Sequence, residues 1–267
     1  MRTRTLAVMA AVLMASEALG TAQQRSVAAD PVKLSWYKAA DALGMLRLAQ
    51  EVDRVSSMNF WATGTLVTEA QPCTLTSYRA SVNWLHTGMR VDFTCQQQPQ
   101  RRIFVVNGTS AWNETEPGRN ATPVPAAADE RQLQIWLLPQ GIVKAAAAAG
   151  SRFAVTTEGT QTVWTLVVPS VGATVTARLN EKSLIERVEA RQGTTVTEIS
   201  YSDYGDWNGA DYLSDVLFPK RITHRRGGTT TLDLTITKTN TYNPYVVMPV
   251  PANVPRTAAQ ATGAARP

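Results

Sequence analysis

The chain lacks most of the residues on which enzyme chemistry usually depends. It has only two histidines and two cysteines among 267 residues, and 18% of its residues are charged. Two histidines cannot form a zinc site with three imidazole ligands. No nucleophile elbow, P-loop or dinucleotide-binding glycine motif is present either. We therefore expect a protein that is not an enzyme, with no metal ion and no cofactor, and we expect His86 and His224 at the surface.

Long apolar runs are also missing, except at the N-terminus. There, two arginines precede an apolar stretch at residues 6–14, and small residues follow at Ala18 and Gly20. A basic end, a short apolar middle and a small-residue exit are typical of a cleaved secretory signal. The stretch is too short to cross a bilayer, which needs about 20 residues. We expect a signal peptide at residues 1–20, with cleavage as late as residue 29 as the alternative, and a periplasmic or secreted protein.

The two cysteines are Cys73 and Cys95, and in an oxidising compartment they predict one disulfide. A two-residue hairpin turn at residues 87–88 would place Cys95 opposite Ala80. The bond would then require the segment around residue 72 to fold back over the sheet, because the two Cα atoms must come within about 7 Å. The alternative is a pair of buried thiols.

Hydrophobic periodicity divides the chain into a helix, strands, a broken helix and more strands. An apolar stripe at helical spacing predicts a helix at residues 39–55. A second helical stretch at residues 129–149 contains Pro139, which should break it near the middle, and Gly150 is a natural stop. Alternation of apolar and polar residues from 89 to 96 predicts an antiparallel strand with one wet face. Further strands are predicted to begin at Trp61 and to cover residues 77–85, 103–106, 110–113, 152–157, 163–168, 174–179, 184–190 and 195–201.

The last predicted hairpin joins residues 218–224 to residues 231–238. A three-residue loop at 226–228 would place Ile222 opposite Leu232 and keep the apolar residues on one face. From residue 249 the chain is rich in proline and alanine, which predicts a disordered tail.

This order of elements predicts a mainly β (α+β) fold: a curved antiparallel sheet or half-barrel with helices across its concave face. The helices favour an open sheet, because an apolar helix needs a sheet face to cover. A closed barrel and a β-sandwich are the alternatives. We expect a single domain at residues 36–248.

Four segments carry a family resemblance: residues 131–150, 201–207, 218–228 and 232–244. They are similar to a family of exported bacterial proteins of unassigned function, which in turn resembles the outer-membrane lipoprotein carriers of the LolA-like fold. The resemblance extends over about residues 40 to 250. It implies a half-barrel closed by helices around an apolar cavity that takes up acyl chains. Some relatives carry this region ahead of a metallo-β-lactamase-type domain, which this chain lacks.

Two groups of residues are candidates for binding. Apolar side chains on the predicted strands and the broken helix could line a cavity for an apolar ligand, and plain core packing is the alternative. These cavity candidates are Trp61, Trp84, Leu133, Trp136, Leu137 and Trp164. A basic cluster could contact lipid headgroups or an acidic partner, although cations also protect strand edges. The cluster comprises Lys220, Arg221, Arg225 and Arg226.

The leading hypothesis is a non-catalytic binding or carrier protein for a lipid or lipoprotein acyl chain. The alternative is an interaction or accessory module of the cell envelope without a small-molecule ligand. Aromatic residues that could stack on bases do not accompany the basic cluster, so nucleic acid is not an expected partner. The formal net charge of +5 is mild and would allow transient contact with a membrane surface.

Overall fold

The computed structural model describes residues 30–46, 55–68, 71–168, 170–207, 216–241 and 246–256. The predicted signal peptide lies outside these residues. The chain divides into a unit that ends at Pro31 and a unit of residues 32–267, and every strand belongs to the second unit. No helix of the described residues is long and apolar enough to span a membrane.

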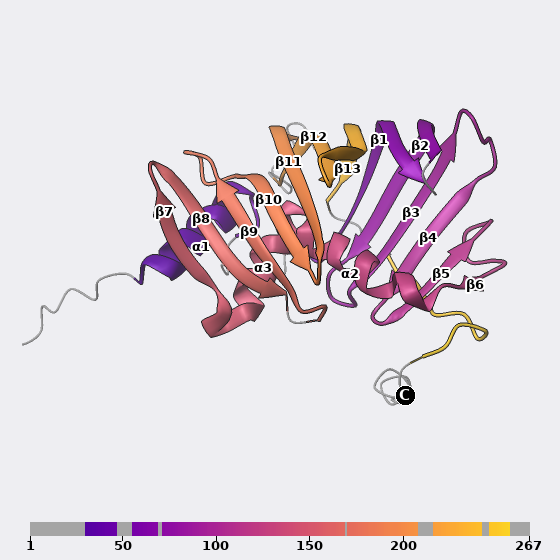
Figure 1. Ribbon diagram of the computed structural model, residues 1–267, viewed down its shortest axis with the longest axis horizontal. Helices are drawn as coiled ribbons and strands as arrows, with labels where there is room; N and C mark the ends of the chain where they lie inside the picture. The colour runs from indigo at the N-terminus through magenta and orange to yellow at the C-terminus, as the bar shows by residue number, and fades with distance from the viewer. Residues whose placement is uncertain are drawn as a thin grey trace, which may run out of the picture. The chain divides into compact units, whose positions relative to one another are not determined.

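Within the described residues, thirteen strands form one open, curved antiparallel sheet, which confirms the predicted fold class (Figure 1). The first group comprises β1 (Ser57–Thr68), β2 (Gln71–Asn83), β3 (Gly88–Cys95), β4 (Arg102–Asn107), β5 (Ser110–Glu114) and β6 (Thr122–Pro123). The second group comprises β7 (Ala154–Glu158), β8 (Gln161–Val168), β9 (Ala173–Leu179), β10 (Ile185–Gln192), β11 (Thr195–Asp206), β12 (Leu217–Arg226) and β13 (Thr229–Asn240).

Each group is a meander in which consecutive strands pair with one another. The strand order is β6-β5-β4-β3-β2-β1-β13-β12-β11-β10-β9-β8-β7, so the first and last strands meet in the middle of the sheet. In that central ladder Trp61 pairs with Lys238, and Leu66 pairs with Leu232. All the other pairings join strands that are neighbours in sequence, which short turns can produce.

The broken helix is confirmed and consists of α2 (Ala128–Leu137) and α3 (Pro139–Ala149). Leu138 between them is extended, with φ −62° and ψ 149°, as expected for a residue that precedes proline. Pro139 begins α3, where its missing N–H is no loss, and Gly150 ends α3 with φ 56°. Gly141 lies so close to α2 that a Cβ there would be 2.3 Å from the Ile135 carbonyl oxygen. Only glycine allows this close approach of the two helices.

The helices cover one face of the sheet, where alternate strand residues form the main core. We call this the inner face; Phe60, Ala80 and Trp164 lie on it. Helix α2 contacts β3, β4 and β5, whereas α3 contacts β8. Figure 1 shows α2 and α3 running across the direction of the strands. We call the space between these helices and the inner face the main interior.

The opposite, outer face carries a second and smaller core at β4 and β5. Residues 246–256 cross this face and cover its apolar side chains. Its buried members are Ile103, Val105, Trp112, Val246, Met248 and Val254. Side chains hold the segment by its backbone: Asn83 donates to the Val246 carbonyl at 2.8 Å, and Asn107 donates to that of Met248 at 2.7 Å. Residues 249–256, which we expected in a disordered tail, therefore lie against the sheet, and the rest of that tail lies outside the described residues.

The first helix differs from the prediction. The structure has α1 at Pro31–Ala42, and residues 43–46 are not helical. The amide of Met45 donates to the Ala40 carbonyl, and the amide of Gly44 donates to that of Asp41. With Gly44 at φ 69°, this is a Schellman ending, which stops the helix where we predicted its first turns. The remainder of the predicted helix, residues 47–54, lies outside the described residues.

Both predicted hairpin turns are also corrected. The turn between β2 and β3 occupies residues 84–87, so Asn83 pairs with Gly88 and Leu75 with Cys95. The last hairpin has a two-residue loop, Gly227-Gly228, and both glycines have the positive φ that such a loop requires. A bulge between His224 and Arg225 then restores the alternation, so Ile222 pairs with Leu234 rather than Leu232.

Candidate functional site

The corrected register explains the disulfide between Cys73 and Cys95. Cys95 lies opposite Leu75, two residues from Cys73 on the same side of β2, and the two Cα atoms are 5.2 Å apart. The chain does not fold back over the sheet, as we expected it would have to. The disulfide joins β2 to β3 at the inner face.

Four of the six predicted cavity residues lie together in the main interior. Trp84 and Leu133 are 5% and 7% exposed, and Leu137 and Trp164 are 3% and 0% exposed. Because protein atoms contact nearly all of their surface, these side chains pack as core and do not line an open cavity. A ligand could enter this region only if the helices moved.

Three tryptophans, of which Trp36 is only partly buried, also anchor the helices through their indole N–H groups. Trp84 donates to the Ile135 carbonyl of α2 at 3.3 Å, and Trp36 of α1 donates to the Val143 carbonyl of α3 at 3.0 Å. Trp164 donates to the Ser35 hydroxyl at 2.8 Å. The aromatic residues thus have a structural role that their spacing in the sequence did not indicate.

Trp61 is separated from the other candidates because it lies on the outer face. The guanidinium of Arg79 is 5.1 Å from the centroid of its ring, and the ammonium of Lys238 is 5.2 Å from it. These residues are its cross-strand partners on β2 and β13. Trp61 therefore forms cation–π contacts in the middle of the wet face and cannot line the main interior.

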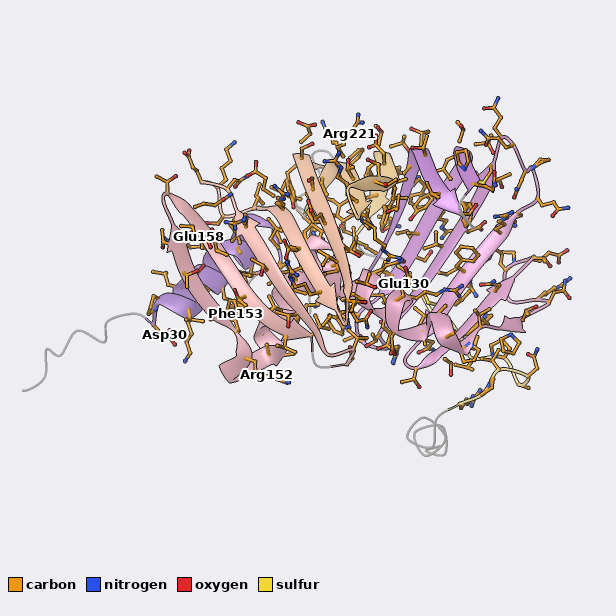
Figure 2. The ribbon with its side chains drawn as sticks, in the orientation of Figure 1. Asp30, Glu130, Arg152, Phe153, Glu158 and Arg221 are labelled. Carbon is orange, nitrogen blue, oxygen red and sulfur yellow. A yellow bond between two sulfur atoms is a disulfide. The ribbon has the colours of Figure 1, made fainter. Side chains whose placement is uncertain are left out.

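The basic cluster does not form one patch. Arg221 pairs with Asp233 at 2.8 Å on β13, and Arg226 pairs with Glu130 on α2 at 2.7 Å. Figure 2 labels Arg221 and Glu130 on these separate elements. Lys220 and Arg225 are exposed, and the described part of the chain offers them no ion-pair partner. Of the four residues in the cluster, these two are the ones left without an ion pair among the described residues.

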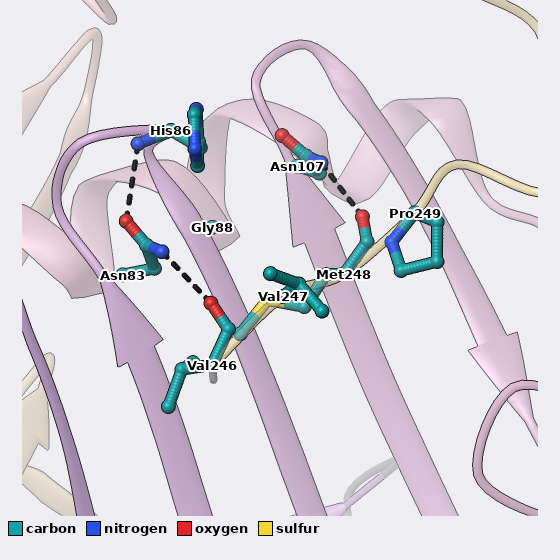
Figure 3. Close-up of a pocket in the computed structure, with 8 residues that line it drawn as sticks. All are labelled: Asn83, His86, Gly88, Asn107, Val246, Val247, Met248 and Pro249. Carbon is teal, nitrogen blue, oxygen red and sulfur yellow. Dashed lines mark hydrogen bonds between the residues drawn. The ribbon is translucent and has the colours of Figure 1, made fainter. Parts of the chain in front are cut away.

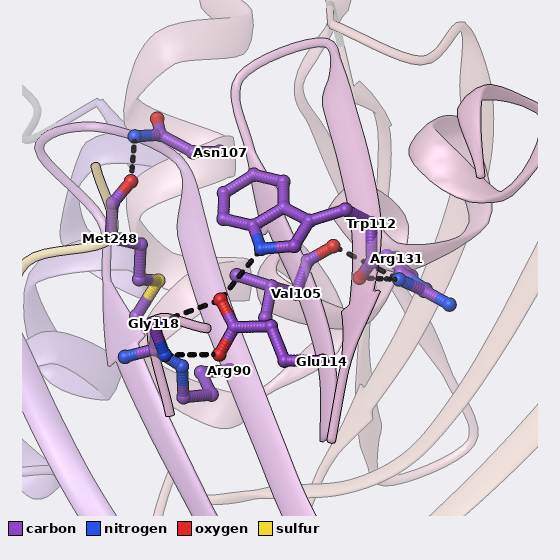
Figure 4. Close-up of polar contacts among 8 residues, drawn as sticks. All are labelled: Arg90, Val105, Asn107, Trp112, Glu114, Gly118, Arg131 and Met248. Carbon is purple, nitrogen blue, oxygen red and sulfur yellow. Dashed lines mark hydrogen bonds and ion pairs between the residues drawn. The ribbon is translucent and has the colours of Figure 1, made fainter. Parts of the chain in front are cut away.

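Arg131, which sequence reasoning missed, fastens α2 to the sheet. It donates to the carbonyls of Val105 at 3.0 Å and Trp112 at 2.7 Å (Figure 4). It also donates to the Asn113 side chain at 2.6 Å. Its guanidinium lies 4.8 Å from the centroid of the Phe104 ring. Burial lowers the pKa of Arg131 to about 10, so it remains charged at neutral pH. Its place in the polar run of residues 129–132 gave no sign of this role.

Four buried polar atoms on the inner side have no hydrogen-bond partner in the described structure. They are Gln132 Nε2 and Trp136 Nε1 on α2, Gln140 Oε1 on α3, and Thr239 Oγ1 on β13. The other amide atom of Gln140 donates to the Leu217 carbonyl at 2.8 Å. Native interiors leave few such groups unpaired, so each of them requires an explanation.

Both histidines were expected at the surface, and only His86 is exposed there. His224 is half-buried on the inner side, where it pairs with Ile199 and Leu232. Burial, and secondarily the charge of Arg226, lower its pKa to about 4, so the ring is neutral at pH 7. Among the described residues, no group of three or more His, Cys, Asp or Glu side chains could hold a metal ion.

Two hollows open at the surface of the described residues. One, of about 300 Å³, lies between the tips of two hairpins and the C-terminal segment, with Asn83, His86 and Met248 in its wall (Figure 3). The other, of about 990 Å³, is a wide depression near Glu158 and Tyr204, and its wall includes Leu179 and Tyr201 of the main core. None of the predicted cavity or basic residues lines either hollow.

No family model matches the chain, and neither does any curated protein sequence. Among solved structures, the chain is similar to a LolA superfamily protein from Nitrosomonas europaea, at 11% sequence identity and a TM-score of 0.41. The match covers 76% of this chain and 90% of that one.

Proposed function

We propose that this is a binding or carrier protein that takes up an apolar chain, such as the acyl chain of a lipid or lipoprotein, between α2–α3 and the inner face. The main observation in support of this proposal is that a helix broken at Leu138 covers the largest apolar surface of the molecule. Such a cover can pivot at the break, because Pro139 interrupts the backbone hydrogen bonds between its halves.

The energies favour uptake into an interior that is closed at rest. Burying each methylene group gains about 0.8 kcal/mol, so a chain of about 14 methylenes gains about 11 kcal/mol. The cover is held by separate polar anchors, among them Arg131, the Tyr201 hydroxyl on the Leu137 carbonyl, and the Arg226–Glu130 pair. Each such bond contributes about 1 kcal/mol. An acyl chain can therefore offset the loss of several anchors.

The first test is to export the protein into a bacterial periplasm, purify it and analyse an organic extract by mass spectrometry. A fluorescent 16-carbon fatty acid is then titrated into the delipidated protein. We expect a stoichiometric apolar molecule in the extract and saturable binding of the probe. Folded protein that yields a clean extract and does not bind the probe would overturn the proposal.

A second candidate is an interaction module of the cell envelope, which the edge strand β7 favours. This strand pairs only with β8 among the described strands, and every residue but Val155 is exposed. It contains neither proline nor lysine, which commonly protect sheet edges. Pull-down of envelope proteins by the wild type, and its loss when Thr156 is replaced by proline, would support this candidate.

A further inference from the structure

A polar stripe runs along the buried side of the broken helix. Gln132 and Trp136 are one turn apart on α2, and Gln140 follows four residues later in the first turn of α3. The close approach of Gly141 places that turn directly against Trp136: a Cβ at Gly141 would lie 3.0 Å from the Cα of Trp136. The three residues therefore occupy adjoining turns on the cover of the main interior.

The polar atoms at the tips of these side chains are buried, and several have no hydrogen-bond partner. Gln132 is 2% exposed and Gln140 is 0% exposed, and each has one amide atom without a partner. The indole N–H of Trp136 also lacks an acceptor. Leucine would fill the space of either glutamine without this penalty, since unpaired buried polar groups destabilise a fold. Such residues are expected where a ligand completes their hydrogen bonds.

We propose that the stripe recognises the amide group at the head of an amide-linked acyl chain. This inference rests on the proposed function. Gln132 Nε2 and Trp136 Nε1 are donors that match the two lone pairs of an amide carbonyl. Gln140 Oε1 is an acceptor that matches the amide N–H, and its orientation is fixed because its Nε2 donates to Leu217. An ester would leave this acceptor unpaired, and an alkane would leave all three groups unpaired.

The test compares three probes of equal chain length: N-methylpalmitamide, methyl palmitate and a saturated alkane. Each displaces a fluorescent fatty acid from the delipidated full-length protein. We expect the wild type to bind the amide at least tenfold more tightly than the alkane and several-fold more tightly than the ester. In Gln132→Leu and Gln140→Leu the amide preference should fall below threefold, while alkane binding is kept. Trp136→Phe, which keeps an aromatic ring and removes the N–H, should lose preference in the same direction.

The control is Gln96→Leu, which changes an exposed glutamine beyond the end of β3 and should leave all affinities unchanged. The melting temperature of each glutamine variant gives an independent measurement: Gln132→Leu should melt higher than the wild type, because it removes an unpaired buried amide. Equal binding of the three probes to the wild type would overturn the inference and leave the carrier function in place. Binding of no probe would overturn the carrier function itself. Equal loss of all probes with a lower melting temperature in the variants would assign the glutamines to packing and also overturn the inference.

Discussion

The main interior and the second core lie on opposite faces of the same sheet, and they differ in how their covers are held. Both faces contain buried polar atoms without a partner, and on the outer face these belong to Asn59 and Arg90. In the main interior, four buried polar atoms have no partner, and the cover is a broken helix. In the second core, Glu114 is 3% exposed and accepts hydrogen bonds from Trp112 at 2.7 Å, from the Gly118 amide at 2.7 Å and from Arg90 at 3.3 Å (Figure 4).

The covers differ in the same sense. Residues 246–256 are held over the second core by hydrogen bonds from Asn83, Asn107 and Ser110 to backbone carbonyls. These hydrogen bonds are distributed along the segment and hold its backbone against the outer face. A cover of this kind stabilises the sheet, whereas the cover of the main interior keeps unused hydrogen-bonding capacity. The proposal that the inner face admits a ligand rests on this difference between the two covers.

The largest effect is expected at Glu114. Replacement by alanine should lower the free energy of unfolding by about 4 kcal/mol, because it leaves the partly buried Arg90 and the indole N–H of Trp112 without their acceptor. Urea denaturation measures the change. The matched control is Glu116→Ala, whose ion pair with Arg119 is exposed and should contribute less than about 0.5 kcal/mol. Similar losses in both variants would remove the distinction between the cores.

Removal of the C-terminal segment should come next. A chain that ends at residue 245 exposes Ile103, Val105 and Trp112, and we expect a loss of about 3 kcal/mol from the apolar area returned to water. Hydrogen exchange at β4 and β5 should accelerate while α2 and α3 are less affected. A chain that ends at Arg256 is the control and should behave as the full chain does. Uniform acceleration over the whole sheet would contradict two separately covered cores.

Gly141→Ala tests the cover of the main interior. The added methyl group would lie 2.3 Å from the Ile135 carbonyl oxygen, so α2 and α3 must separate. We expect a loss of about 2 kcal/mol, which is typical of overpacking, together with faster hydrogen exchange in α2 and faster uptake of a fluorescent fatty acid. Faster uptake by a less stable protein is the outcome that ties the helix break to ligand entry. If uptake is unchanged, the packing of α2 against α3 does not control ligand entry.

The smallest effect concerns pH. The pKa of His224 is about 4 in the folded protein and about 6.5 in an unfolded chain. As the pH falls from 6.5 to 4, the unfolded chain therefore binds a proton that the folded protein does not, and stability decreases. Because the ring is only half-buried, we expect a loss of about 1 kcal/mol across this window. In His224→Gln this part of the pH dependence should disappear from thermal melts, and its persistence would assign it to other groups.

Local patterns predicted much of the fold. Alternation located the strands, Pro139 marked the break in the helix and Gly150 marked its end, because these signals act within a few residues. The Schellman ending at Gly44 was equally local and was overlooked. The two hairpin registers failed for a different reason: a turn one or two residues longer, or a bulge, preserves the alternation while moving every pairing partner.

By itself, the sequence determined the class of fold and the order of its elements. It also determined that at most one disulfide can form within the chain, because there are only two cysteines. The tertiary structure alone decided that β1 meets β13, that residues 246–256 cover a second core, and that Trp61 lies outside while Gln132 and Gln140 lie unpaired within. The physical reason is the distance along the chain over which each kind of interaction acts. Periodicity reports which side of an element is apolar, whereas the partner that covers that side is set by contacts between residues far apart in the chain.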